Sequence, residues 1–240
     1  MKRSLCLVGL SMLFCPLLAC GAPGEGASAL AGDADAARMA AYRTALEGIY
    51  YDHVLPDGRE CDDPKGEAEC AFAVYDMDQD GRAELMVWYE GASTAGKTVD
   101  IYDCSDESGA LYQEFSAYPM LTFYDNGIIR AHNQGVAGEN FWPYSMYQYD
   151  EGTDTYQIVG MADAWDCTLT RSHGGQVFPR DADVDGDGMV YYVMSGEGYD
   201  NSSPVDGLAY EQWENTLIGG AQVVDVDWTP LTKKAMAALS

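Results

Sequence analysis

Residues 71–89 read AFAVYDMDQDGRAELMVWY, two apolar runs separated by an acidic stretch that contains one glycine. The runs at 71–75 and 84–89 are rich in the aromatic and β-branched residues that favour strands. Glycine and aspartate between such runs are typical of a turn. We therefore expect a β-hairpin here, with the acidic stretch as its loop.

The same alternation of short apolar runs and turn residues continues along the chain. Asp125-Asn126-Gly127 is a hairpin signal, and residues 150–154 form a longer one. Further short strands are expected at 98–102, 111–115, 121–124, 128–132, 145–149, 156–159 and 190–194. This spacing predicts an antiparallel meander, arranged like propeller blades or as a curved sheet.

Helical patterns flank the meander on both sides. The inward face of an N-terminal helix, capped by Asp35, is expected to hold Met39, Tyr42, Leu46, Ile49 and Tyr50. A C-terminal helix is expected at 208–218, then a half-buried strand at 224–228, then a short helix opened by Thr229-Pro230. The predicted fold class is therefore α+β, with a β-rich middle, an N-terminal helix and a C-terminal helix-strand-helix segment.

The first nineteen residues have the form of an export signal. Lys2 and Arg3 precede an apolar run at 5–18, which ends in Ala19-Cys20. This ending resembles the lipobox of bacterial lipoproteins, which implies cleavage before Cys20 and lipid on its thiol. We expect a signal peptide at 1–19, the lipidated Cys20 with a flexible tether to residue 33, and one soluble domain at 34–240. The expected location is outside the cytoplasm, anchored to a bacterial membrane at the cell surface.

The chain is strongly acidic. Residues 1–19 hold two basic and no acidic residues, so the rest has 11 basic against 39 acidic residues, a net charge of −28. This charge argues against nucleic acid and anionic membrane surfaces as partners, and it suits divalent cations. The lipid bilayer, reached through Cys20, and a glycan or protein ligand are the expected partners.

Cysteine usage predicts disulfides. Cys6 and Cys15 leave with the signal and Cys20 is modified, so the remaining set is Cys61, Cys70, Cys104 and Cys167. An even number in an oxidising compartment predicts two bridges, for which three pairings exist. We favour Cys61–Cys70, because the loop between them is short and polar, and this leaves Cys104–Cys167. A thiol zinc site is the weaker alternative, because the sequence has no CxxC pair.

The acidic loop of the hairpin has the spacing of a calcium loop. Asp76, Asp78 and Asp80 stand at positions one, three and five, and Gly81 at position six permits a sharp bend. Hard oxygen ligands in this number suit Ca²⁺ rather than a transition metal. Position twelve is Val87, where an EF-hand has a bidentate glutamate, so a complete EF-hand is excluded. The simpler interpretation is a solvated acidic turn.

This spacing resembles the DxDxDGxxE loops of FG-GAP and VCBS-type repeats, over residues 72–88. The resemblance implies calcium bound by the carboxylates of Asp76, Asp78, Asp80 and Glu84 and by the backbone carbonyl of Arg82. If calcium binds, we expect an affinity of about 0.1–1 mM and a structural role, because the ion joins carboxylates that otherwise repel one another.

A second acidic stretch at 181–188 admits two registers. We prefer the one in which Asp183, Asp185 and Asp187 precede Gly188 at position six and the Met189 carbonyl stands at position seven, because a strand follows directly. The other register begins at Asp181. Neither has a carboxylate at position nine, so a ligand must come from elsewhere, with Asp163, Asp166, Glu197, Asp200 and Glu211 as the candidates.

A wider resemblance covers most of residues 40–240. The motifs that carry it are Phe72-Ala-Val-Tyr-Asp-Met-Asp-Gln-Asp-Gly, Leu121-Thr-Phe-Tyr-Asp-Asn-Gly, Phe141-Trp-Pro-Tyr, Asp163-Ala-Trp-Asp, Asp185-Gly-Asp-Gly-Met-Val-Tyr-Tyr and Tyr210-Glu-Gln-Trp. In this order they resemble uncharacterised surface lipoproteins of Gram-positive gut bacteria. This resemblance implies location at the cell surface, and the group has no assigned activity that could be transferred to this chain.

We find no catalytic motif in the sequence, neither a G-x-S-x-G elbow nor HExxH, and the three histidines are scattered. His53 is expected to pack inward, while His132 and His173 lie in predicted loops. A surface that stacks sugars could be formed by Trp142, Tyr144, Trp165 and Tyr199, although such aromatic residues more often belong to the core.

We therefore expect a non-catalytic, calcium-stabilised binding or adhesion module at the cell surface. One alternative is a hydrolase that acts on envelope or dietary polysaccharide, which requires a cleft with two carboxylates and one strongly raised pKa. The other alternative is a structural envelope protein.

Overall fold

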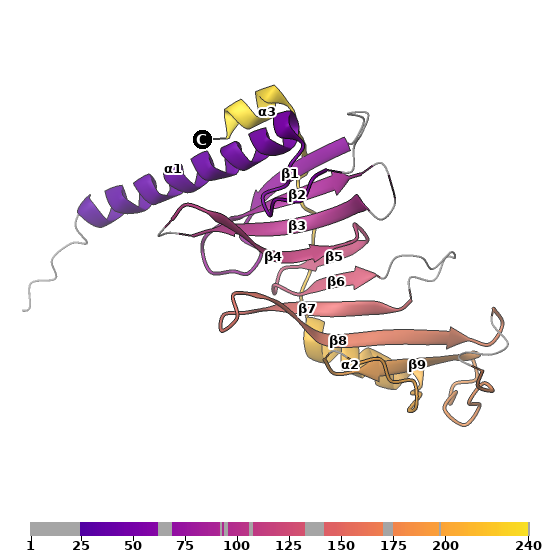
Figure 1. Cartoon of the computed structure of the whole chain (residues 1–240). Coiled ribbons are helices and arrows are strands. Elements are labelled where there is room, and N and C mark those ends of the chain that lie inside the picture. The colour runs from indigo at the N-terminus through magenta and orange to yellow at the C-terminus, as the bar shows by residue number, and fades with distance from the viewer. Residues whose placement is uncertain are drawn as a thin grey trace, which may run out of the picture.

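The protein consists of two antiparallel sheets flanked by helices, as the computed structural model in Figure 1 shows. The structure describes residues 25–61, 69–91, 93, 96–105, 108–132, 142–169, 175–196 and 198–239, and side chains from residue 34 onward. The predicted signal peptide and Cys20 lie outside these residues. The predicted α+β class with an antiparallel meander is confirmed.

The first sheet has five described strands. Their spatial order is β11 (Thr229–Pro230), β1 (Glu69–Tyr75), β2 (Glu84–Glu90), β3 (Lys97–Cys104) and β4 (Leu111–Ala117). From β1 to β4 each strand pairs with the next one along the chain. The hairpin expected from residues 71–89 is thus the β1–β2 pair, in which Tyr75 lies opposite Glu84.

The second sheet has six described strands. Their order is β10 (Val223–Val224), β5 (Leu121–Tyr124), β6 (Ile129–His132), β7 (Tyr144–Asp150), β8 (Thr155–Asp166) and β9 (Met189–Met194). Between β4 and β5 the ladder is interrupted at residues 118–120, where Pro119 has no N–H to donate. The meander therefore divides into two sheets at this point.

Helix α1 (Glu25–Glu47) packs against the first sheet. Tyr42 and Leu46 are completely buried there. The helix begins ten residues before Asp35, so residues 25–33 are helical and not the flexible tether that we expected. The alanine-rich sequence explains this difference, because alanine has the highest helix propensity.

A wider turn follows α1 and changes which side chains face inward. This π-helical turn, η1 (Gly48–Asp52), keeps Ile49 buried at 3% exposure, but it leaves Tyr50 37% exposed. His53 ends the turn in a left-handed conformation and is exposed. The predictions that Tyr50 and His53 pack inward were wrong, because they assumed the regular period of an α-helix.

The C-terminal segment connects the two sheets. After α2 (Gly207–Ile218) the chain adds β10 to the edge of β5 and then β11 to the edge of β1, and it ends in α3 (Lys233–Ala238), which contacts α1 (Figure 1). The expected strand at 224–228 is therefore only two residues long. The final helix begins after Thr232, whose hydroxyl accepts from the Ala235 N–H, and not at Thr229-Pro230.

The structure records no disulfide among the described cysteines, Cys61, Cys70, Cys104 and Cys167, so the predicted bridges are not confirmed. Cys61, Cys70 and Cys104 contact the core around Tyr42, whereas Cys167 belongs to a different core cluster. The structure therefore gives no support to Cys104–Cys167. The Cys61–Cys70 pairing stays a prediction.

No helix in the described part of the chain combines the length and the hydropathy that are needed to cross a bilayer.

Candidate functional site

The first acidic loop connects β1 to β2 and brings four carboxylates together. Asp76, Asp78, Asp80 and Glu84 each offer one oxygen, and these oxygens all lie within 4.8 Å of one another. Every carboxylate that the sequence assigned to this loop thus belongs to one cluster. A group of this composition could hold a metal ion.

Backbone N–H groups fix the carboxylates of this loop. The Gly81 N–H donates to Oδ2 of Asp76 at 3.2 Å, the Asp80 N–H to Oδ1 of Asp78 at 3.0 Å, and the Arg82 N–H to Oδ1 of Asp80 at 2.7 Å. Gly81 has a φ of +90°, a left-handed conformation that favours glycine. The bend expected at position six is therefore present.

Glu84 closes the loop from the interior of the protein. Its side chain is 1% exposed, and its Oε2 accepts from the Met77 N–H at 2.6 Å. Burial, together with the charge of Asp78, raises the pKa of Glu84 to about 9. Burial also raises the pKa of Asp78. The cluster thus brings carboxyl groups together between the exposed Asp80 and the buried Glu84, and a bound cation would relieve their mutual repulsion.

Contacts with three other parts of the structure hold the loop in place. The Tyr42 hydroxyl, from α1, donates to the Ala83 carbonyl at 2.9 Å. The Gln79 side-chain amide donates to the Asp125 carbonyl, in the turn after β5. On the outer side, Arg82 forms ion pairs with Asp80 at 2.7 Å and with Asp103 of β3 at 2.9 Å. The predicted role of the Arg82 carbonyl as a ligand stays a prediction.

The second acidic loop repeats the hydrogen bonds of the first. The Gly188 N–H donates to Asp183 at 3.4 Å, the Asp187 N–H to Asp185 at 3.1 Å, and the Met189 N–H to Asp187 at 2.7 Å. Gly188 has a φ of +87°, close to the +90° of its counterpart in the first loop. This pattern belongs to the register that begins at Asp183, which the sequence favoured.

The fourth position of the second loop is taken by a residue that sequence analysis missed. Asp206, which directly precedes α2, clusters with Asp183 and Asp185 within 4.8 Å. Its Oδ1 accepts from the Val184 N–H at 2.9 Å, as Glu84 does from the second residue of the first loop. Asp187 is not part of this group, and its Oδ1 accepts the Met189 N–H.

A short β-bridge places Asp206 beside the loop. Tyr191 and Val205 exchange backbone hydrogen bonds of 2.9 and 2.8 Å, which bring the start of α2 to β9. The only signal in the sequence is an aspartate just before a predicted helix, which usually indicates an N-cap. Here the side chain makes no capping hydrogen bond to its own helix.

Three of the five candidates that we named for this position have other partners. Asp163 accepts from the Tyr199 hydroxyl at 2.6 Å, Asp166 from the Thr168 hydroxyl at 2.6 Å, and Asp200 from the Ser202 N–H at 2.8 Å. Glu197 and His173 lie outside the described residues. Glu211 is exposed on α2 and is not part of the metal-binding group.

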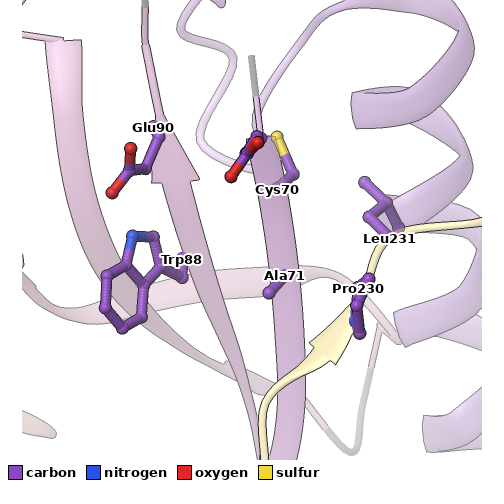
Figure 2. A pocket seen from close by; sticks show the side chains of 7 residues that line it. Cys70, Ala71, Trp88, Glu90, Pro230 and Leu231 are labelled. Carbon is purple, nitrogen blue, oxygen red and sulfur yellow. The ribbon is translucent and has the colours of Figure 1, made fainter.

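An open hollow of about 520 Å³ lies over β1, β2 and β11, away from both loops (Figure 2). Trp88 and Glu90 line one side of it, and Pro230 and Leu231 line the other. A second hollow of about 310 Å³ shares Trp88 and is also lined by Trp228. The two indole rings meet edge to face at 5.4 Å, between the hollows.

The sugar-stacking surface proposed from the sequence is only partly accessible. Tyr144 and Trp165 are 2% and 1% exposed and belong to the core, whereas Trp142 is half-buried and Tyr199 is 51% exposed. The half-buried Trp88 is a better candidate, because it borders both hollows.

The chain matches no protein-family model, no curated protein and no solved structure. Its function is therefore interpreted from its own residues and geometry.

Proposed function

We propose that the protein is a calcium-stabilised, non-catalytic binding module that a lipid on Cys20 anchors at the outer side of a bacterial membrane. One observation carries the calcium part of this proposal. Two loops, more than a hundred residues apart in the sequence, have the same backbone hydrogen bonds, and in each a further carboxylate accepts from the N–H of the loop's second residue.

Calcium is the ion that best suits these groups. All donor atoms are carboxylate or carbonyl oxygens. Such oxygens suit magnesium and calcium better than they suit softer metal ions. Adaptable loops of alternating aspartates suit the larger shell and flexible geometry of calcium better than the rigid octahedron of magnesium. The clusters are also built into an acidic protein, with 39 acidic against 13 basic residues, whose field attracts cations.

The proposed anchor rests on the sequence. The apolar run, Ala19-Cys20 and the alanine- and glycine-containing segment that follows are the features of a lipoprotein signal. The resemblance to surface lipoproteins of Gram-positive gut bacteria supports the same location.

The burial of the carboxyl groups with raised pKa values favours a binding function over a catalytic one. The hydrolase alternative needs two carboxyls that a substrate can reach, one of them with a raised pKa. Burial raises the pKa of Glu84 to about 9 and of Glu114 to about 8, yet these side chains are only 1% and 4% exposed. Trp88 borders an open hollow instead, which suits a glycan ring stacked on indole. A structural envelope protein would need no such hollow.

Calorimetric titration of the purified protein with calcium tests this proposal. We expect two binding events for the unaltered protein, loss of one in Asp78→Ala, and loss of the other in Asp185→Ala. Asp150→Ala is the matched control, because Asp150 accepts N–H bonds in an exposed acidic turn outside both loops. Absence of binding heat, together with an unchanged melting temperature, would remove calcium from the proposal.

A further inference from the structure

Glu114 is a buried carboxylate that lacks a partner. It lies on β4 and is 4% exposed, and its buried Oε2 accepts no hydrogen bond from the described residues. The strand pairing shifts between Ile101 and Tyr102, which leaves Glu114 as the extra residue of a β-bulge. A bulge changes the direction of a side chain, so Glu114 and the following Phe115 are both buried.

Two further buried oxygens, one in the second sheet and one in the first loop, also lack hydrogen bonds. One is the hydroxyl of Tyr156 on β8, a residue that is 7% exposed, and the other is Oδ1 of Asp76 in the first loop. The rings of Tyr156 and Phe115 meet at 5.6 Å, so β8 touches β4 next to Glu114. The three oxygens come from the loop and from both sheets.

The electrostatics place these groups around the first loop. Besides burial, the charges that raise the pKa of Glu114 are those of Asp78 and other nearby aspartates. Burial, followed by the charges of Glu84, Asp78 and Glu114, raises the pKa of Tyr156. Glu114 and Tyr156 are therefore buried close to the carboxylates of the first loop.

Burial without a partner is costly for such groups. A polar atom that is buried without a partner loses its hydrogen bonds to water and gains none in exchange, and the cost is larger when the group is charged. Native proteins therefore pair nearly all of them with protein atoms, water or ions. Three unpaired oxygens beside one acidic loop indicate that the loop and its surroundings are shaped for a hydrated cation.

We infer that Glu114 and Tyr156 form the inner wall of the cation site in the first loop, an inference that rests on the proposed calcium binding. Glu114 is not among the carboxylates that cluster within 4.8 Å, so it acts through a water molecule of the ion. Calcium accepts six to eight oxygens and often includes water. That water donates to Glu114 and bonds the Tyr156 hydroxyl, so the ion links the β1–β2 hairpin to both sheets.

The test compares Glu114→Gln and Tyr156→Phe with the unaltered protein by calcium titration. Loss of an outer-shell partner typically weakens metal binding by about 10–100-fold, and we expect this range at the first loop. The second loop serves as an internal reference and should keep its affinity. Asp163→Asn is the matched control, because Asp163 is a buried carboxylate whose oxygens accept from the Ala164 N–H and the Tyr199 hydroxyl.

The outcomes separate this inference from the proposed function. If the unaltered protein binds calcium and both variants bind it equally well at the first loop, Glu114 and Tyr156 are not part of the site. If the unaltered protein binds no calcium, the proposed function itself fails. Should Glu114→Gln not fold, Tyr156→Phe decides alone, because it removes only the hydroxyl oxygen and keeps the ring contact with Phe115.

Discussion

Asp206 occupies, beside the second acidic loop, the position that Glu84 occupies beside the first. Asp206 lies 2.9 Å from the Val184 nitrogen, and Glu84 lies 2.6 Å from the Met77 nitrogen. Glu84 belongs to the strand that follows its own loop, whereas Asp206 comes from a segment 22 residues beyond Val184. Two different chain connections thus place a carboxylate at the N–H of the second residue of each loop.

Replacing Asp206 by asparagine should weaken calcium binding at the second loop by about tenfold or more, because a charged ligand becomes a neutral one. The first loop should keep its affinity, and calorimetry distinguishes the two sites. Asp200→Asn is the control, since Asp200 lies in the same segment but accepts from Ser202. An unchanged second binding event would show that Asp206 does not act as a ligand.

The metal-free protein should lose stability as the pH rises. Burial raises the pKa of Glu84 from 4.5 to about 9 and that of Glu114 from 4.5 to about 8. The folded chain then holds more protons than the unfolded chain between these values, so the free energy of unfolding falls across that window. Thermal unfolding, monitored by circular dichroism, should give a lower melting temperature at about pH 8.5 than at about pH 5.5.

Calcium should remove much of this pH dependence, because the ion replaces the protons as counter-charge. Glu114→Gln should show a weaker dependence without calcium, since one of the two titrating groups is gone. A melting temperature that stays level or rises with pH in the metal-free protein would contradict the raised pKa values.

Removal of the Tyr42 hydroxyl should destabilise the protein. Tyr42 is 0% exposed and donates to the Ala83 carbonyl at 2.9 Å, so Tyr42→Phe leaves that carbonyl without this donor. We expect a loss of about 1–2 kcal/mol in the free energy of unfolding, measured by urea denaturation. Tyr51→Phe, at a residue that is 54% exposed, should cost much less. Equal losses would show that the bond to the loop contributes little.

Replacement of Trp88 by alanine tests the hollow as a glycan site. If an indole ring stacks on a sugar there, Trp88→Ala should weaken retention in polysaccharide affinity gels by about tenfold or more. Trp142→Ala, at a half-buried tryptophan that lines neither hollow, is the control. Failure of the unaltered protein to bind any envelope or dietary polysaccharide would leave a protein ligand as the partner of this surface.

The membrane anchor is tested by Cys20→Ser. We expect the unaltered protein to incorporate labelled fatty acid in a bacterial host and to partition into detergent, and the variant to do neither. Cys15→Ser, within the predicted signal peptide, should behave as the unaltered protein does. Detergent partition of the Cys20 variant would refute lipid attachment at this residue.

Local sequence patterns predicted the parts of the structure that depend only on residues close together in the sequence. The β1–β2 hairpin and the first acidic loop follow from alternation, turn residues and ligand spacing within residues 71–89. The register of the second loop follows in the same way from Gly188 and the strand after it. These features need no information about distant segments.

Contacts between distant segments explain what the sequence did not reveal. Asp206 reaches its loop only because Tyr191 and Val205 pair, and a single sequence does not show such a bridge. Glu114 faces inward because of a β-bulge, which breaks the period of two that sequence analysis assumes. The exposure of His53 has a similar cause, since η1 departs from the regular helical period.

The run from β10 to β11 has a further consequence for solubility. These two short strands cover the outer backbone of β5 and of β1, and they lie within one stretch of eight residues, Val223–Pro230. A single proteolytic cut that detached this stretch would uncover two sheet edges at once. Unpaired edges of this kind template pairing with other chains. The segment Val223–Pro230 therefore protects both sheets from edge-to-edge aggregation by pairing with β5 and β1.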